Sequence, residues 1–121
     1  MAKKLVIMCT HGAEEPERAT IPFVMATTAQ AMDVEVVMGF QAEGVTLAGK
    51  GVAERIAAPG FPPLKDLVAA YREAGGKFLV CGPCVQSRGI DPKNDFVDGA
   101  SVVNAATFVS ECIEATNVLV Y

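Results

Sequence analysis

Two cysteines separated by a glycine and a proline form the part of this sequence best suited to chemistry. Cys81 and Cys84 have the Cys-x-x-Cys spacing, with which two thiols can exchange with disulfides or close a small disulfide ring. Cys81 follows a predicted strand and precedes a predicted helix start, where free backbone N–H groups lower a thiol pKa. Arg88 follows and adds positive charge. We therefore expect Cys81 to be a reactive thiolate that accepts sulfur as a persulfide, although a buried structural cysteine would show the same pattern.

The tetrapeptide Cys81-Gly82-Pro83-Cys84 is also the active-site sequence of thioredoxins, but other features of that family are missing. The chain has no tryptophan to precede the motif. A Thr-Ile-Pro sequence occurs only upstream, at residues 20–22, so none follows the motif to supply a cis-proline. The motif also comes after the third predicted strand rather than the first. The sequence thus argues against a thioredoxin fold and leaves dithiol redox chemistry open as an alternative.

Cys9 and His11, at the end of the first predicted strand, are candidates for the rim of the same pocket. With Cys81 and Cys84 they would offer three sulfur ligands and one imidazole, a set that suits Zn²⁺ or Cu⁺. Cys-x-His is not a recognised half-site, so we expect no metal or other cofactor and keep a metal site as an alternative. His11 then either tunes the Cys81 thiolate or caps a loop, and Cys9 alternatively fills the core. Cys112 lies on an apolar helix stripe and is expected in the core.

Apolar runs and amphipathic segments alternate along the chain and predict an α/β fold. Strands are expected at residues 4–9, 34–38, 77–81, 100–103 and 118–120, with helices across 21–32, 64–71 and 105–113. This alternation favours a flavodoxin-like three-layer sandwich, in which about five parallel strands carry helices on both faces. We expect the first strand beside the third, which would bring Cys9, His11 and the Cys-x-x-Cys motif to one edge. Met25 and Met32 have the spacing of core residues on the first helix.

Length and charge narrow the class of protein further. A chain of 121 residues without repeats or linkers is expected to form a single domain, residues 1–121. Its 14 acidic and 10 basic residues give a net charge of −4, so neither nucleic acid nor an anionic membrane is an expected partner. The apolar run near the N-terminus is too short for a signal peptide or a membrane span, and we expect a cytoplasmic protein.

Hydrophobic content favours an oligomer. Hydrophobic residues make up 51% of the chain, and the mean hydropathy is +0.34. The glycine-rich segment 39–62 also carries more apolar side chains than we expect one small core to absorb. They are Phe40, Val45, Leu47, Val52, Ile56 and Phe61.

Around Cys81 the sequence resembles the DsrE/DsrF family, which includes the TusD sulfur-relay subunits. Cys81 matches the reactive cysteine that ends a central strand in that family, and residues 88–90 match its Arg-Gly-aliphatic group. The Gly-Val-x-Leu segment at residues 44–47 and the order of the first and last elements are also similar. The resemblance implies a flavodoxin-like sandwich, a homotrimer or homohexamer, and persulfide-based sulfur transfer between a donor protein and an acceptor protein.

Under this resemblance Cys81 holds the persulfide and passes the sulfur to an acceptor protein or to Cys84. The residues expected to shape or charge the pocket are Gly82, Pro83, Arg88 and Gly89. Cys84 departs from the sulfur-relay subunits, which carry a small apolar residue there. Whether the chain is an enzyme stays open, and if it is, the class is sulfurtransferase. The alternatives are an oligomeric binding protein with a Cys/His metal site and a dithiol redox protein that uses Cys81 and Cys84.

Overall fold

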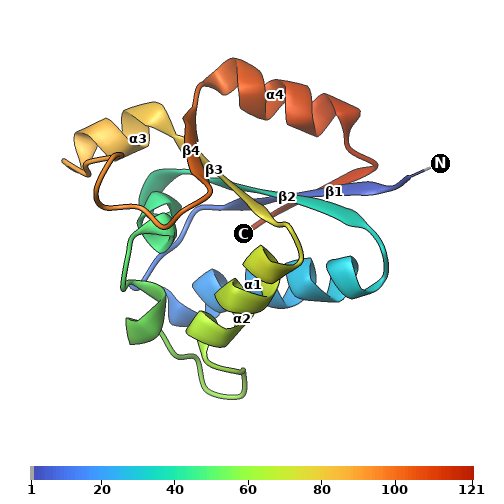
Figure 1. Ribbon diagram of the computed structural model, residues 1–121, viewed down its shortest axis with the longest axis horizontal. Helices are drawn as coiled ribbons and strands as arrows, with labels where there is room; N and C mark the ends of the chain where they lie inside the picture. The colour runs from blue at the N-terminus through green and yellow to red at the C-terminus, as the bar shows by residue number, and fades with distance from the viewer. Residues whose placement is uncertain (1) are drawn as a thin grey trace.

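The computed structural model describes residues 2–121, in which a five-stranded parallel sheet lies between helices on both faces (Figure 1). The strands are β1 (Lys4–Cys9), β2 (Glu35–Phe40), β3 (Lys77–Cys81), β4 (Ala100–Val103) and β5 (Asn117–Val120). The α-helices are α1 (Pro16–Ala31), α2 (Leu64–Glu73), α3 (Gly82–Ser87) and α4 (Ala105–Glu114). Two 3-10 helices, η1 (Ala42–Ala48) and η2 (Ala53–Arg55), follow β2. The predicted α/β fold with five parallel strands is confirmed.

The strand order, β4-β3-β2-β1-β5, differs from the expected one. β1 pairs with β2 and β5, so the prediction that it lies beside β3 was wrong. Residues 36–40 of β2 are buried one after another, which suits a strand in the middle of the sheet. The chain runs outward from β1 to β4 with α1 and α2 on one face, and then returns to β5 through α4 on the other (Figure 1).

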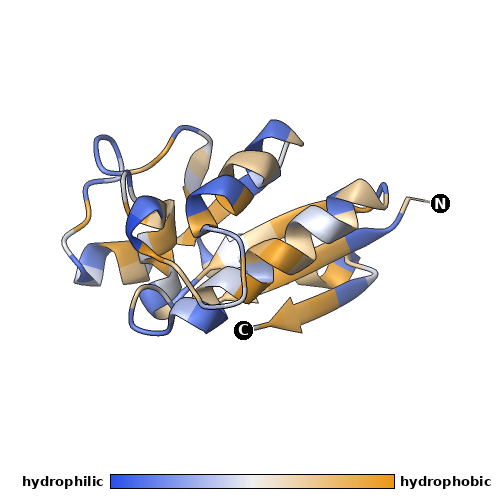
Figure 2. Cartoon of the chain, turned by 90° about the horizontal axis from the view of Figure 1, so that it is seen from below, coloured by the Kyte–Doolittle hydropathy of each residue, from blue (hydrophilic) through white to orange (hydrophobic). Residues whose placement is uncertain are grey.

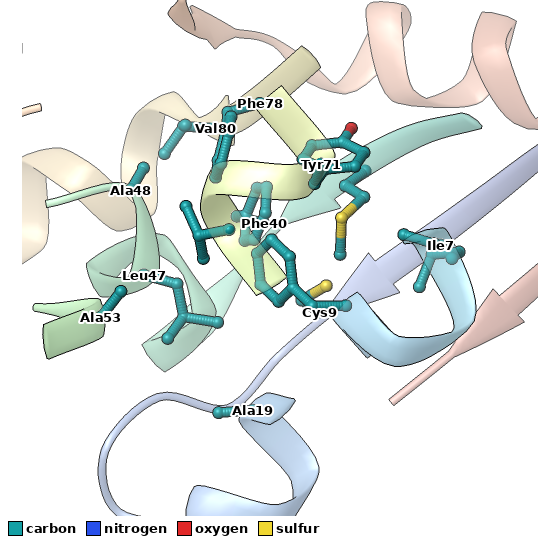
Figure 3. Close-up of a cluster of buried hydrophobic side chains, with 14 of the residues drawn as sticks. Ile7, Cys9, Ala19, Phe40, Leu47, Ala48, Ala53, Tyr71, Phe78 and Val80 are labelled. Carbon is teal, nitrogen blue, oxygen red and sulfur yellow. The ribbon is translucent and has the colours of Figure 1, made fainter. Parts of the chain in front are cut away.

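The main core lies between the sheet and the layer formed by α1 and α2. Phe40 and Phe78 stack with ring centroids 5.2 Å apart, and Tyr71 meets Phe78 edge-on at 5.4 Å. The Tyr71 hydroxyl donates a hydrogen bond to the carbonyl oxygen of Lys77, so its polar atom is satisfied. Figure 3 shows Cys9 among these side chains. The face under α4 holds a smaller buried cluster of Val6, Met8, Val37 and Phe108.

Helix α1 turns a different face to the core than its sequence pattern predicted. Phe23 and Ala26 are fully buried, whereas Met25 and Met32 are 40% and 70% exposed. The predicted core positions of the two methionines were therefore wrong. This helix carries apolar side chains on all of its faces, so hydrophobic periodicity does not select one of them. Phe23 faces the core because an aromatic ring has the larger apolar surface to bury.

Segment 39–62 folds back onto the sheet through η1 and η2. This chain buries Val45, Leu47 and Ile56 in its own core. The expectation that a contact with another subunit would bury them was therefore wrong. The strands remain the most consistently hydrophobic elements (Figure 2). Large apolar side chains are exposed elsewhere, at Met25, Met32, Val102, Val109, Ile113 and Val120.

Candidate functional site

The two cysteines of the Cys-x-x-Cys motif lie together at the carboxyl end of β3. Cys81 is the last residue of that strand, and Cys84 is in the first turn of α3, which folds back beside it. Both are free thiols with partly exposed side chains, and a hydrogen bond joins them. β3 lies between β2 and β4, so the pair sits at an inner position of the sheet edge. The strand-to-helix turn positions the thiols as the sequence predicted.

A backbone N–H from another element also reaches Cys84. The amide nitrogen of Ala42, the first residue of η1, donates to the Cys84 Sγ at 3.3 Å. Ala42 has a φ of 50°, in the left-handed region that costs a non-glycine residue free energy. Gly44 allows η1 to press against β1, because a Cβ there would lie 2.1 Å from the carbonyl oxygen of Cys9. The close packing of η1 thus places a hydrogen-bond donor on the Cys84 sulfur.

Arg88 directly follows α3, and its side chain contacts the backbone of that helix at Cys84. Its Nη1 donates to the carbonyl oxygen of Cys84 at 3.2 Å, and its Nε donates to Oε1 of Glu43 at 3.0 Å. The ion pair with Glu43 offsets part of the guanidinium charge. Gly89 follows with a φ of 65°, a conformation that favours glycine. Arg88 was expected to favour the Cys81 anion; it instead contacts the backbone of Cys84 and is shared with a carboxylate.

The two thiols differ in acidity, in the order opposite to the one expected. Burial and the hydrogen bond with Cys84 raise the pKa of Cys81. The same hydrogen bond lowers the pKa of Cys84, and the Ala42 N–H and the Arg88 guanidinium lower it further against the effect of partial burial. The expectation that Cys81 has the lowered pKa was wrong, because burial disfavours the Cys81 thiolate and the hydrogen bond between the two thiols favours that of Cys84.

Cys81 borders a small apolar pocket under α4. The pocket has a volume of about 190 Å³ and is lined by Gln41, Cys81, Pro83, Val103, Ala105, Phe108 and Val109. Cys81 packs against the clusters on both sheet faces, whereas Cys84 packs only against the one between the sheet and the layer of α1 and α2. Pro83 lines this pocket as predicted, and Gly82 lies in an adjoining hollow between α3 and β4. Cys81 therefore borders an apolar pocket, whereas the sulfur of Cys84 accepts a backbone N–H.

Cys9 does not reach this site. Its side chain is 1% exposed and lies in the core beside Phe40 (Figure 3), and burial raises the pKa of its thiol. β2 separates β1 from β3, so the ends of those strands are not neighbours. The placement of Cys9 at the pocket was wrong, and its alternative role as a core residue is correct.

His11 caps a loop instead of contacting the thiols. Its Nδ1 lies 2.8 Å from Oε2 of Glu14, and the other oxygen of Glu14 accepts the N–H of Gly12 at 2.5 Å. Burial would raise the pKa of Glu14, but these hydrogen bonds outweigh it and lower the pKa. Of the two roles considered for His11, the structure supports the loop cap.

The four residues of the metal alternative do not converge. Cys9 is in the core and His11 is paired with Glu14, which leaves only Cys81 and Cys84 together. Within residues 2–121, no group of three or more His, Cys, Asp or Glu side chains is arranged to hold a metal ion. We therefore do not retain the Cys/His metal site.

Sequence reasoning missed the residues that contact the site but lie far from it in the sequence. Ala42 and Glu43 come from η1, and Phe108 and Val109 come from α4. None of them belongs to a chemical motif. The one signal near them is the Gly-Val-x-Leu segment, whose Gly44 fits η1 against β1.

A parallel α/β sandwich with two hydrogen-bonded thiols at the end of an inner strand defines a small thiol-bearing protein. The sequence model of the DsrE/DsrF-like family matches residues 3–121, and the chain belongs to this family. It is 35% identical over 107 residues to the uncharacterised protein MJ0760 of Methanocaldococcus jannaschii, a match that covers 88% of this chain. The match spans only 38% of that longer protein.

Solved structures show the same fold at low sequence identity. The ychN protein from E. coli superposes with a TM-score of 0.80 at 16% identity, covering 98% of this chain and 99% of that one. MTH1491 from Methanobacterium thermoautotrophicum, a protein of unknown function, gives a TM-score of 0.72 at 16% identity with the same coverage. In the part of the chain that the structure describes, no helix is long and apolar enough to cross a membrane.

Proposed function

We propose that this chain is a sulfur carrier that holds a persulfide on Cys81 and passes the sulfur to an acceptor protein. The observation that carries the proposal is a partly exposed thiol at the end of β3, bordered by a small apolar pocket and joined to a second thiol. Membership of the DsrE/DsrF-like family supports it, because the sequence resembles the relay members around this cysteine. If the carrier turns over as an enzyme, the reaction is sulfur transfer.

The pocket suits the storage of a persulfide. A neutral S–SH group is less strongly hydrated than a thiolate, so an apolar lining from Phe108 and Val109 favours it over the ionised form. Transfer to the acceptor then requires the acceptor thiolate to attack the outer sulfur of this persulfide while Cys81 leaves with the electron pair of the broken S–S bond.

Partners follow from the chemistry of the carrier. The proposal requires a donor protein with a persulfide, an acceptor protein with a thiol, and a reducing compartment such as the cytoplasm, in which free thiols persist. It treats residues 1–121 as a single DsrE-like domain that needs no cofactor. We further propose that copies assemble as a homotrimer or homohexamer. The exposed valine and isoleucine side chains of α4 support such assembly.

The second candidate is a dithiol redox protein, favoured by the hydrogen bond between Cys81 and Cys84. The Cys-x-x-Cys spacing is one with which two thiols can close a disulfide on oxidation. Cys84→Ser separates the candidates, because it abolishes a dithiol reaction and leaves a carrier thiol in place. A persulfide carrier keeps sulfur on Cys81 in this variant, whereas a dithiol protein loses its activity.

Intact mass after incubation with glutathione persulfide tests the carrier directly. We expect wild-type protein to gain sulfur that dithiothreitol removes, and fragment-ion mapping to place the retained sulfur on Cys81. The double variant Cys81→Ser/Cys84→Ser gains none at this site, and the matched control Cys112→Ser gains as much as wild type. A wild-type protein that gains no sulfur, while alkylation still reaches Cys81, contradicts the proposal.

A further inference from the structure

We infer that Cys84 is the first acceptor in this site: it takes the sulfur from the donor and hands it to Cys81. The inference rests on the proposed function and adds an order to it. It also gives a role to Cys84, which the relay subunits resembled by this chain lack.

The contacts of the two sulfur atoms differ in the way that such an order requires. The Cys84 Sγ accepts the N–H of Ala42 at 3.3 Å, and the neighbouring Cys81 thiol lowers the pKa of Cys84, so both groups favour its thiolate. Cys81 instead borders the apolar pocket with Phe108 and Val109, where a thiolate would be poorly solvated. Cys84 is therefore suited to nucleophilic attack on a donor persulfide, and Cys81 is suited to retaining the transferred sulfur.

The charges around the pair support this division. The groups that face Cys84 are the Cys81 thiol, the Arg88 guanidinium at the end of α3 and the Glu43 carboxylate from η1. Glu43 is paired with Arg88, so its negative charge is partly neutralised. The balance lowers the pKa of Cys84, chiefly through the Cys81 hydrogen bond, and raises that of Cys81 through burial.

The transfer proceeds in two balanced steps. First, the Cys84 thiolate attacks the outer sulfur of a donor persulfide, the donor S–S bond breaks, and the donor thiolate leaves with the electron pair. Second, the sulfur of Cys81 attacks the outer sulfur of the Cys84 persulfide, and the proton of Cys81 passes to the departing Cys84 sulfur. The net result is Cys81–S–SH and a free Cys84 thiol, with no change in oxidation state.

A time course of loading with glutathione persulfide tests the order. Trypsin cuts after Lys77 and Arg88, so both cysteines share one peptide, and fragment ions assign the trapped sulfur to one of them. In wild type we expect sulfur on Cys84 first and on Cys81 later. In Cys81→Ser the sulfur stays on Cys84. In Cys84→Ser the loading of Cys81 at neutral pH slows by about tenfold or more, because the thiolate fraction of the attacking group falls.

The pH profile and a matched control make the result specific. The deficit of Cys84→Ser shrinks as the pH rises, since Cys81 then ionises by itself. Cys112→Ser changes another partly buried cysteine and loads at the wild-type rate in the wild-type order. Wild-type loading rates in Cys84→Ser would overturn the inference and leave the carrier proposal intact. Rapid conversion of wild type to a Cys81–Cys84 disulfide with release of sulfide would also overturn it. Absence of sulfur on any cysteine overturns both.

Discussion

The four cysteines show that surroundings, more than local sequence, decide what a thiol can do. Cys9 ends a strand just as Cys81 does, yet its sulfur lies in a sealed core and burial raises its pKa. Cys81 and Cys84 differ in acidity because burial raises the pKa of Cys81, whereas the hydrogen bond from Cys81, and after it the N–H of Ala42, lower the pKa of Cys84. The donor comes from a segment about forty residues away, a separation at which local sequence patterns carry no information about contact.

At the residue scale, Cys81→Ala should make Cys84 less reactive. The hydrogen bond from Cys81 is the largest cause of the lowered pKa of Cys84, so its loss raises that pKa and lowers the thiolate fraction at neutral pH. We expect the rate of alkylation of Cys84 by iodoacetamide near pH 7 to fall by roughly threefold to tenfold. Arg88→Ala should give a smaller decrease, because Glu43 already offsets that charge.

The same experiment has an internal reference. Cys112→Ala removes another partly buried thiol, near the end of α4, and should leave the rate at Cys84 unchanged. An alkylation rate at Cys84 that stays constant or increases without Cys81 would show that the hydrogen bond between the thiols does not set the acidity of the pair.

At the scale of elements, the sequence predicts individual strands and helices better than their arrangement. The bounds of β1, β3 and β4 agree with the predicted ones, because continuous apolar runs end at polar or glycine residues. The order of the strands does not follow from these runs, since all are similarly apolar. The position of Cys81 at a strand end was therefore predictable, whereas the contacts of η1 with Cys84 depend on the tertiary packing of Gly44.

The first turn of α4 is stabilised by a local interaction, a side-chain cap from the residue before the helix. Asn104 immediately precedes this helix, and its Oδ1 accepts the N–H of Thr107 at 3.1 Å and the Thr107 hydroxyl at 3.3 Å. Asn104→Ala should reduce the free energy of unfolding by about 1 kcal/mol, because a backbone donor loses its partner. Urea denaturation measures the change. The control Ser110→Ala lies on the exposed face of the same helix and should stay within about 0.5 kcal/mol of wild type. Equal stabilities of the two variants would contradict the capping role.

At the scale of the whole molecule, the distribution of apolar surface differs from the sequence expectation. Segment 39–62 supplies core residues, so it no longer explains the high hydropathy of the chain. The unburied apolar side chains include Val109 and Ile113, which lie one turn apart on the outer side of α4. These β-branched side chains lose little rotamer freedom on burial, whereas exposed Met32 loses more. A contact between copies is thus more favourable over α4 than over the methionines of α1.

This difference predicts how assembly responds to a charge. Ile113 is 77% exposed and Met32 is 70% exposed, so replacing either with glutamate should cost a single copy little stability. If copies associate over α4, Ile113→Glu buries a charge at the contact, and we expect the oligomer measured by light scattering with size exclusion to dissociate toward the monomer. Met32→Glu adds the same charge on the opposite layer and should leave the mass unchanged. Because Val109 also lines the pocket beside Cys81, dissociation by Ile113→Glu would place the contact between copies next to the thiol pair. A monomeric wild-type protein, or an oligomer that persists in Ile113→Glu, would contradict the prediction that copies associate over α4.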